Sequence, residues 1–107
     1  MLYMTIQTFT RQIQDIKNQF HNLGPLRPGT LTRQYRDPKK KIGPFYQISY
    51  TYRMKSRTEY VRHAFIPQIQ KEIANYNRFK RLIRKWIDLA LRLSQLQINL
   101  AKKSLPK

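Results

Sequence analysis

The side chains of this chain that could take part in chemistry are mainly cationic. The sequence of 107 residues holds 22 Lys and Arg against 5 Asp and Glu, which gives a formal net charge of +17. Basic side chains bind anions through charge and through the hydrogen bonds that they donate, and so large an excess favours a polyanionic partner. The first chemistry that the sequence indicates is therefore binding to a phosphate backbone.

The positive charge is concentrated in the later part of the chain. Residues 1–26 carry a net charge of only +1, whereas residues 27–63 and residues 64–107 each carry ten basic residues against two acidic ones. A generally basic coat would be spread more evenly. The distribution predicts a dedicated basic surface within residues 27–107.

The first part of that surface falls in a region of expected strands and turns. Basic side chains on a small sheet suit phosphate contacts, and a two-stranded ribbon fits the major groove of DNA. Tyr35 is the best candidate for stacking on a base, because its neighbours are basic. Nine predicted phosphate-binding residues, called here the sheet cations, are Arg33, Arg36, Lys39, Lys40, Lys41, Arg53, Lys55, Arg57 and Arg62.

The second part of the basic surface lies on an expected long helix. Arg78, Arg81 and Lys85 are separated by three and four residues, so they share one side of a helix and are predicted to extend the phosphate-binding surface. A basic amphipathic helix can also lie on an anionic membrane or against an acidic protein. We do not expect a membrane partner, because the apolar residues continue at heptad spacing and are better explained by helix packing.

Catalysis is not supported by residue types or spacing. The acidic residues are scattered among basic ones, and Asp88 has Arg92 four residues later as an ion-pair partner. His21 and His63 lie in different expected elements and lack the spacing of a metal site. There is no cysteine, and residues 24–29 lack the Lys-Ser/Thr of a phosphate-binding loop. We therefore expect no enzyme activity, no catalytic residues, no metal and no cofactor.

The elements that position these residues begin with a helix over residues 5–22. Thr5 is a plausible N-cap, and Gly24-Pro25 is expected to end the helix, because Gly fits a C-terminal cap and Pro cannot continue it. Apolar residues recur at steps of three and four, as in one face of an amphipathic helix. They are Ile6, Phe9, Ile13, Ile16, Phe20 and Leu23.

A three-stranded antiparallel meander is predicted next. Strands are expected over residues 30–35, 45–53 and 58–63, joined by a turn-rich basic loop over residues 36–44 and a short connection over residues 55–57. The middle strand alternates in character. The even positions that we expect to pack on the long helix are Tyr46, Ile48, Tyr50 and Tyr52.

A long amphipathic helix is predicted for most of residues 64–105, with Pro67 in its first turn. A helix of about 37 residues would be roughly 55 Å long. It must therefore break near its middle or pack its distal part on the first helix or on another chain. The apolar stripe, which Ile83, Ile87 and Ala90 widen, consists of Phe79, Leu82, Trp86, Leu89, Leu93, Leu96 and Leu100. The predicted class is α+β, as a single domain over residues 1–107 with segments 1–23, 24–63 and 64–105.

Several short motifs resemble a small family of uncharacterised basic domains in bacteria and archaea. The motifs are Leu26-Arg27-Pro28-Gly29-Thr30-Leu31, Gly43-Pro44-Phe45-Tyr46-Gln47-Ile48-Ser49-Tyr50, Lys55-Ser56-Arg57-Thr58 and Ile73-Ala74-Asn75-Tyr76-Asn77-Arg78-Phe79. The resemblance covers about residues 23–95, and such domains often occur near mobile elements or among transposase-like proteins. Many members carry a cysteine cluster in the first hairpin loop. That loop has no cysteine here, so a metal role does not carry over.

The resemblance raises the expectation of nucleic-acid binding but implies no established activity. A looser architectural similarity links three strands followed by a helix to the DNA-binding arm domains of tyrosine recombinases. The predicted function is therefore non-enzymatic binding of DNA or RNA, as an accessory to a mobile element such as a transposase, recombinase or nuclease system. The alternative is an oligomerisation or protein-interaction subunit whose heptad helices bind a second copy or a larger nucleic-acid enzyme.

The expected location is the cytoplasm or nucleoid. No uncharged apolar run approaches the roughly 20 residues that span a bilayer. The first eight residues lack the basic and apolar regions of a signal peptide.

Overall fold

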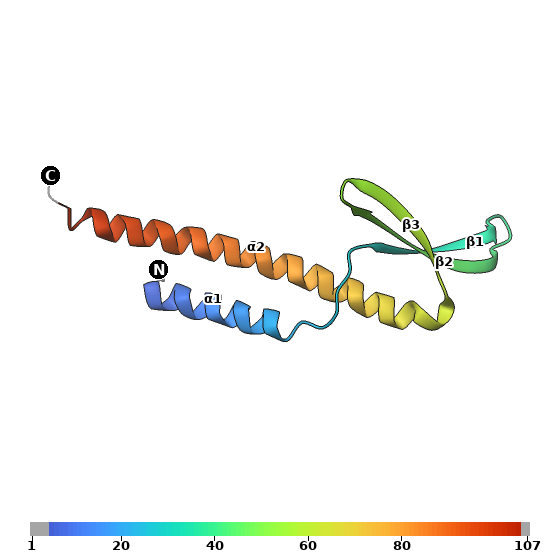
Figure 1. Ribbon diagram of the computed structural model, residues 1–107, viewed down its shortest axis with the longest axis horizontal. Coiled ribbons are helices and arrows are strands. Elements are labelled where there is room, and N and C mark those ends of the chain that lie inside the picture. Colours follow the sequence, from blue (N-terminus) through green and yellow to red (C-terminus); the bar gives the residue numbers. More distant parts are fainter. Residues whose placement is uncertain (1–4, 106–107) are drawn as a thin grey trace. The chain divides into compact units, whose positions relative to one another are not determined.

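Residues 5–105 are described by the structure, which is a computed structural model. Along the chain they form α1 (Ile6–His21), β1 (Thr30–Asp37), β2 (Ile42–Tyr52), β3 (Lys55–Val61), a 3₁₀ turn (His63–Phe65) and α2 (Ile66–Lys102) (Figure 1). The predicted α+β class, with an N-terminal helix, a three-stranded antiparallel sheet and a long C-terminal helix, is confirmed. The break considered for the long helix does not occur, because α2 is continuous.

The contacts group the chain into two compact units, and α2 contributes to both. The helical unit contains residues 1–23 and 79–107, and the sheet unit contains residues 24–78. The first boundary coincides with the predicted end of the N-terminal segment. The second falls inside α2, where the sequence shows no interruption of the helical pattern.

The ends of α1 are set by local hydrogen bonds. The backbone N–H of Thr8 donates to Thr5 Oγ1 at 3.1 Å, which confirms Thr5 as the N-cap. The predicted cap at Gly24 is wrong. Asn22 caps the helix instead, and its N–H donates to the carbonyls of Asn18 at 3.3 Å and Gln19 at 3.2 Å before the chain reaches Gly24.

The core of the helical unit joins the apolar stripes of α1 and α2. Phe9, Ile16, Leu82 and Leu89 are buried, and the Phe20 ring meets the rings of Phe79 and Trp86 at 5.5 and 5.6 Å. Packing of the long helix on the first helix is therefore confirmed, and the two helices run antiparallel (Figure 1).

Two residues of the predicted apolar stripe and its border do not join this core. Leu100 was expected in the stripe and is 44% exposed, and Ile87 was expected to widen it and is 55% exposed. The helical period explains the exposure of Ile87, because the five-residue step from Leu82 turns this side chain well away from the side of α2 that meets α1.

The core of the sheet unit is built around Ile48, whose side chain is fully buried. Ile48 lies opposite Leu31 on β1 and Glu59 on β3, in an antiparallel sheet of strand order β1-β2-β3. It packs with Val61 and with residues of the first turns of α2, namely Ile66 and Ile69. The expected packing of alternate β2 residues on the long helix holds for Ile48 and Tyr46. It is wrong for Tyr52, which lies beside the β2–β3 turn and is 52% exposed.

The strands are longer than the sequence predicted. β1 continues to Asp37 and β2 begins at Ile42, so the predicted loop over residues 36–44 shrinks to a tight turn over residues 38–41. Pro44 is tolerated within β2 because pairing with β3 begins only at Tyr46, so β2 is an edge at that point. Residues 55–57, predicted as a connection, begin β3.

Only the middle of the sheet has three strands. β1 pairs with β2 from Thr30 opposite Ser49 toward the first turn, and β3 pairs with β2 from Val61 opposite Tyr46 toward the second turn. Beyond this overlap, each end of the sheet is a two-stranded ribbon that ends in a turn.

The segment before β1, residues 24–29, is fixed to the sheet unit by backbone contacts. The Arg27 N–H donates to the Glu72 carbonyl at 3.2 Å, and Asn75 Nδ2 donates to the Pro25 carbonyl at 2.8 Å. Gly29 has φ of 149°, and a Cβ there would lie 2.7 Å from two carbons of the Ile48 side chain. Only glycine satisfies both the backbone angle and the close approach.

Replacing Gly29 by Ala should therefore lower the free energy of unfolding by about 2–3 kcal/mol, because it combines an unfavourable φ with overpacking of a buried residue. Equilibrium urea unfolding measures this loss. Gly24→Ala is the control, since its Cβ would approach one side-chain atom, Asn75 Nδ2 at 3.1 Å, with no left-handed φ and no contact to a buried carbon. We expect the control to lose less than about 1 kcal/mol, and equal losses at the two positions would contradict the role assigned to Gly29.

Candidate nucleic-acid interface

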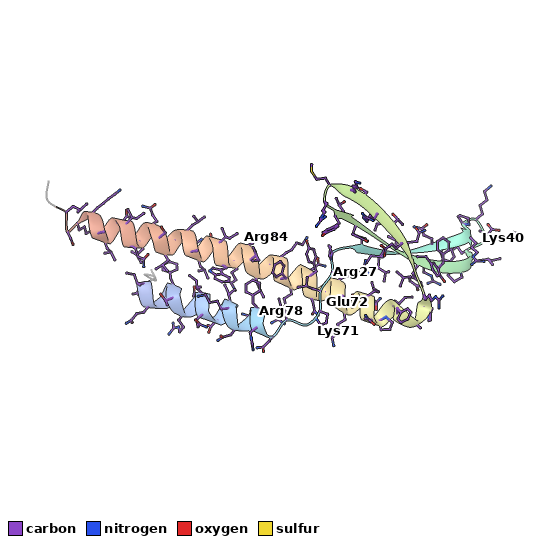
Figure 2. The ribbon with its side chains drawn as sticks, in the orientation of Figure 1. Arg27, Lys40, Lys71, Glu72, Arg78 and Arg84 are labelled. Atoms are coloured by element: carbon purple, nitrogen blue, oxygen red, sulfur yellow. The ribbon has the colours of Figure 1, made fainter. Side chains whose placement is uncertain are left out.

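The β1–β2 turn presents three consecutive lysines to solvent. Asp37 Oδ1 accepts a hydrogen bond from the Lys40 N–H at 3.3 Å, which closes the turn, and Lys41 adopts a left-handed φ of 53°. Gly43 then follows with φ of 69°, and the side chain of Arg36 lies against it. The Lys40 side chain extends from the tip of the turn (Figure 2). Arg36 and the three lysines are exposed, and we call them the first-turn cations.

The β2–β3 turn is a two-residue turn in which both central residues are left-handed. Arg53 has φ of 51° and Met54 has φ of 65°, the geometry of a type I′ turn that usually holds Asn-Gly. The Arg53 guanidinium lies over the Tyr52 ring at 5.2 Å, and Met54 is 97% exposed. Together with Arg53, the exposed residues Lys55 and Arg57 form the second-turn cations.

The two turns that carry these cations lie at opposite ends of the sheet (Figure 1), because successive turns of a meander alternate between its ends. They are joined by β2, which has 11 residues. At about 3.3 Å per residue, the turns are at most roughly 35 Å apart. The sequence predicted both groups, and the meander predicted for residues 30–63 implies that they are separate.

The sheet cations are not neutralised within the molecule. Within residues 5–105, Arg27 is paired with Glu59 at 3.7 Å and Arg92 with Asp88 at 3.3 Å. None of the nine sheet cations has a carboxylate partner in this part of the chain. Their charges are therefore available to an anionic partner.

The face of the sheet opposite Ile48 carries hydrogen-bonding groups without charge between the two turns. The register fixes this outer face, since side chains alternate along each strand and directly paired residues share a face. Ser49 and Thr58 are hydrogen-bonded to each other at 3.2 Å, and Tyr60 is 64% exposed. The members of the outer face are Thr30, Thr32, Gln34, Phe45, Gln47, Ser49, Thr51, Ser56, Thr58 and Tyr60.

Sequence reasoning did not identify the outer face as part of a site. The only signal was the mostly polar character of the odd positions of β2. Without the register, these positions could not be joined to Thr30 and Thr32 on one side or to Ser56 and Thr58 on the other.

Two other predicted sheet residues lie along β1, away from the turns. Tyr35 is half-buried, and the Arg33 guanidinium lies over its ring at 5.2 Å. Arg33 shares the inner face with Tyr46 and Val61. A base that stacked on Tyr35 would compete with Arg33 for the ring or use its other side. Tyr52 and Tyr60 are more exposed than Tyr35.

The predicted helix cations are divided between the two units. Arg78 belongs to the sheet unit, whereas Arg81 and Lys85 belong to the helical unit, and all three are exposed. Lys85 lines a shallow groove of about 210 Å³ together with Asp15 and other residues of α1 and α2. The first- and second-turn cations are therefore carried by one sheet, whereas the helix cations are divided between the two units.

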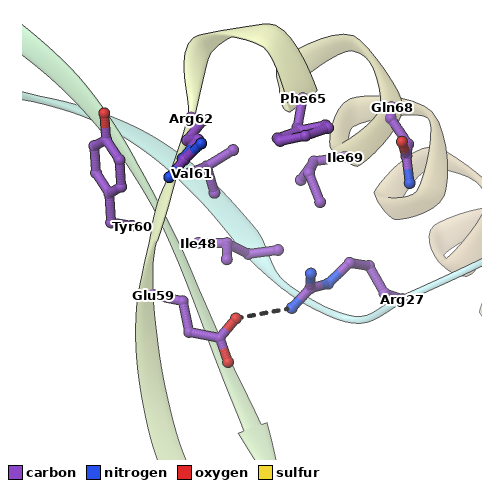
Figure 3. Close-up of a pocket in the computed structure, with 9 residues that line it drawn as sticks. All are labelled: Arg27, Ile48, Glu59, Tyr60, Val61, Arg62, Phe65, Gln68 and Ile69. Atoms are coloured by element: carbon purple, nitrogen blue, oxygen red, sulfur yellow. Dashed lines mark ion pairs between the residues drawn. The ribbon is translucent and has the colours of Figure 1, made fainter.

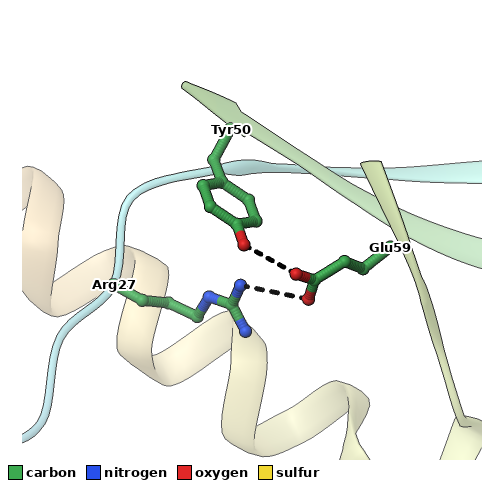
Figure 4. Close-up of polar contacts among 3 residues, drawn as sticks. All are labelled: Arg27, Tyr50 and Glu59. Atoms are coloured by element: carbon green, nitrogen blue, oxygen red, sulfur yellow. Dashed lines mark hydrogen bonds and ion pairs between the residues drawn. The ribbon is translucent and has the colours of Figure 1, made fainter. Parts of the chain in front are cut away.

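Arg27 was not predicted as a site residue and has a structural role. Its guanidinium lies 3.7 Å from Glu59 Oε2 and 5.2 Å from the Tyr50 ring, while the Tyr50 hydroxyl donates to Glu59 Oε1 at 2.6 Å (Figure 4). The hydrogen bond to Glu59, aided by desolvation and the Glu59 charge, raises the pKa of Tyr50 above its ordinary value. The contacts hold residues 24–29 against β2 and β3.

A pocket of about 380 Å³ lies beside this network, between β3 and the start of α2 (Figure 3). Ile48, Val61 and Ile69 form its apolar lining, and Arg27 and Glu59 meet within it. Arg62 is the sheet cation that lines this pocket. Within residues 5–105, no group of three or more His, Asp or Glu residues gathers in a way that could hold a metal ion.

Comparisons with models of protein families, with curated proteins and with solved structures find no match to this chain. The resemblance noted from short motifs therefore stays a prediction. No helix within the described range combines the length and apolar character needed to cross a membrane.

The Tyr50–Glu59 hydrogen bond predicts a pH dependence of stability. Because the folded-state pKa of Tyr50 is raised above 10.0, its stabilising effect is fully present below pH 10 and is lost as the pH rises through the folded value. Urea unfolding of the parent and of Tyr50→Phe is measured at pH values below and above the folded-state pKa of Tyr50. The two chains should differ in unfolding free energy below it, and the difference should disappear above it.

Tyr52→Phe is the control for that experiment, since it leaves the Tyr50–Glu59 bond intact. We expect this variant to keep the alkaline loss of stability that the Tyr50–Glu59 bond gives the parent. A constant difference between Tyr50→Phe and the parent would show that the hydroxyl's titration does not affect folding.

Proposed function

We propose that this chain is a non-enzymatic nucleic-acid-binding protein that holds a phosphate backbone through its sheet unit. One observation carries the proposal. Exposed cations without carboxylate partners within residues 5–105 lie at both ends of a small sheet, and an uncharged hydrogen-bonding face lies between them.

The division of roles follows from the chemistry of each surface. The first- and second-turn cations suit phosphate oxygens, which fix the position of a nucleic acid without reading its sequence. The hydroxyls and amides of the outer face suit base edges and sugars, because Ser, Thr and Gln both donate and accept hydrogen bonds. Arg62 lies beyond the end of β3, and Arg78, Arg81 and Lys85 are further candidates for phosphate contacts.

The shape of the sheet favours duplex DNA among nucleic acids. Each end is a two-stranded ribbon, and the major groove of B-form DNA admits such a ribbon, whereas that of A-form RNA is too narrow. By strand length the turns are at most roughly 35 Å apart, which is close to one helical turn of DNA. Lys55 and Arg57 pair with Tyr52 and Tyr50 and so share the face of Ile48. We therefore expect the two groups to reach phosphates from the two ends of the sheet, with Lys55 and Arg57 approaching from the side of Ile48.

The acidic residues support binding rather than catalysis. Glu59 is paired with Arg27, Asp88 is paired with Arg92, and Asp37 closes the β1–β2 turn. Glu72 accepts a hydrogen bond from Gln68 at 2.9 Å. Each of these carboxylates makes a contact that serves the fold.

Replacing Lys39, Lys40 and Lys41 by Ala tests the phosphate contacts. We expect affinity for a random-sequence DNA duplex of about 20 base pairs to fall at least about tenfold, because three phosphate contacts are lost. The slope of log affinity against log salt should flatten by up to about 3. Fluorescence anisotropy over a salt series measures both, with an A-form RNA duplex of the same length for comparison.

A matched variant separates a local effect from the loss of total charge. Arg11→Gln, Lys17→Gln and Lys103→Gln together remove three positive charges from the helical unit and should change affinity less than about threefold. Equal weakening by the two triple variants would reduce the proposal to nonspecific attraction. Unchanged binding by the lysine-turn variant would exclude that turn from the interface, and stronger binding to the RNA duplex would contradict the preference for DNA.

The outer face is tested by placing negative charge on it. Ser49→Asp with Thr58→Asp puts two carboxylates where bases or sugars would approach, so we expect duplex affinity to fall by at least about tenfold through repulsion. Gln7→Glu with Thr10→Asp adds the same charge to exposed positions of α1 and should have little effect. If both pairs weaken binding equally, the outer face does not approach the nucleic acid.

A further inference from the structure

A second stripe at heptad spacing runs along α2 and is not covered by the fold. It is called here the exposed stripe and consists of Ile87, Leu91, Ser94, Ile98 and Ala101, at successive steps of four, three, four and three residues. Its three large side chains are 55%, 67% and 48% exposed at Ile87, Leu91 and Ile98. The stripe is distinct from the one that packs on α1, whose buried members are Leu82 and Leu89.

The surroundings of the exposed stripe are nearly neutral, in contrast to the rest of the chain. From Trp86 to Ala101 the only charged residues are Asp88 and Arg92, and these form an ion pair at 3.3 Å, so that with Lys102 at its end the stretch carries a net charge of only +1. Two copies of a chain of net charge +17 repel each other, and the repulsion is smallest where they meet through a nearly neutral surface. An acidic partner would find no uncompensated cation from Trp86 to Ala101.

The pattern of the stripe is complementary to itself when a second copy runs antiparallel. In the heptad, Leu91 and Ile98 take the first core position, and Ile87, Ser94 and Ala101 take the second. Antiparallel helices pair the first position of one copy with the second position of the other. Leu91 of each copy then faces Ala101 of the other, and Ile98 faces Ser94, so every such layer combines a large side chain with a small one.

The residues flanking the stripe match under the same two-fold axis. The register that pairs Leu91 with Ala101 brings Asp88 of each copy beside Lys102 of the other, which gives two ion pairs of opposite charge. The same register also places Gln95 of one copy opposite Gln95 of the other, and Gln97 opposite Gln97 of the other. Amide side chains both donate and accept hydrogen bonds, so identical residues can pair, whereas identical charges would repel.

We propose that the exposed stripe is the interface of an antiparallel homodimer, formed by α2 of two copies over residues 87–102. A symmetric interface must be self-complementary, because each residue meets the same surface on the partner. The stripe meets this requirement in shape, in charge and in its amide residues. The stripe predicted from the sequence as a partner or dimer surface is instead occupied by α1.

The dimer carries two sheet units and so two copies of the proposed nucleic-acid surface. Linked surfaces raise the effective concentration of the second one after the first has bound. The dimer itself does not depend on the proposed function. Its test is the oligomeric state of protein that has been freed of nucleic acid.

Sedimentation velocity of the whole chain tests the dimer after a high-salt step has removed nucleic acid. Measured at about 0.15 M salt over protein concentrations from about 5 to about 200 µM, the mass should rise from the monomer value of 13.0 kDa toward twice that value. Leu91→Asn with Ile98→Asn should leave a folded monomer throughout, because both residues are exposed in the monomer. Met54→Asn, at another exposed apolar residue, is the matched control and should dimerise like the parent.

A charge exchange tests the antiparallel register. Asp88→Lys and Lys102→Asp should each raise the dimer dissociation constant on the order of tenfold, because each places like charges together twice by symmetry. The double variant should return to within about threefold of the parent. Lys103→Asp, which changes the same charge one residue away, is the control for Lys102→Asp, and circular dichroism verifies that each variant keeps its helix content.

Three outcomes would overturn the proposal. A parent chain that stays monomeric up to about 200 µM has no such interface. A dimer that persists after Leu91→Asn with Ile98→Asn forms through another surface. A dimer that depends on the stripe but is not restored by the double charge exchange is not antiparallel in this register. Loss of DNA binding with the dimer intact would instead contradict the proposed function alone.

Discussion

The structure depends on how the apolar residues of one long helix are covered. α2 has 37 residues and is continuous, and no helix of this length can hide its apolar side within itself. Residues near its start pack with Ile48 and Val61 of the sheet, whereas Leu82 and Leu89 pack with Phe9 and Ile16 of α1. The two cores are separate, each is small, and each would expose an apolar stripe of α2 if its partner element were removed. Burial of apolar surface on this helix is thus the common source of stability for both units.

The charge distribution follows from this arrangement. No polar or charged residue within residues 5–105 is buried, so the cations must occupy turns, strand ends and the uncovered side of the helix. The few acids are used where they fix the fold, as Glu59 does through Arg27 and Tyr50. Cations at the sheet ends consequently lack carboxylate partners within residues 5–105, and Arg53 and Met54 hold left-handed backbone angles that Asn-Gly would adopt more easily. The sheet ends therefore combine unbalanced charge with a backbone geometry that is costly for these residue types.

Much of the fold could be predicted because it rests on short-range patterns. The α1 stripe, the Thr5 cap and the absence of Gly and Pro after Pro67 each act within a few turns of helix. Strand limits were less accurate, because Pro44 and residues 55–57 read locally as loop and become strand only through pairing with a neighbour. The same reason hid the outer face, since Thr30, Ser49 and Thr58 meet only through the register. Arg27 was missed because a single basic residue in a loop carries no sign of the distant carboxylate that it pairs with.

The sequence by itself determined the elements, the excess of positive charge and its absence from the first segment, because composition and periodicity are properties of the linear chain. Tertiary structure decided which of the apolar stripes on α2 is covered. α1 takes the stripe of Leu82 and Leu89, and Ile87, Leu91 and Ile98 stay exposed. Tertiary structure also put neutral hydrogen-bonding groups between the first- and second-turn cations, because these groups come together only through the register. These outcomes depend on which surfaces meet in space, and a periodic pattern specifies that a face will be buried without specifying its partner.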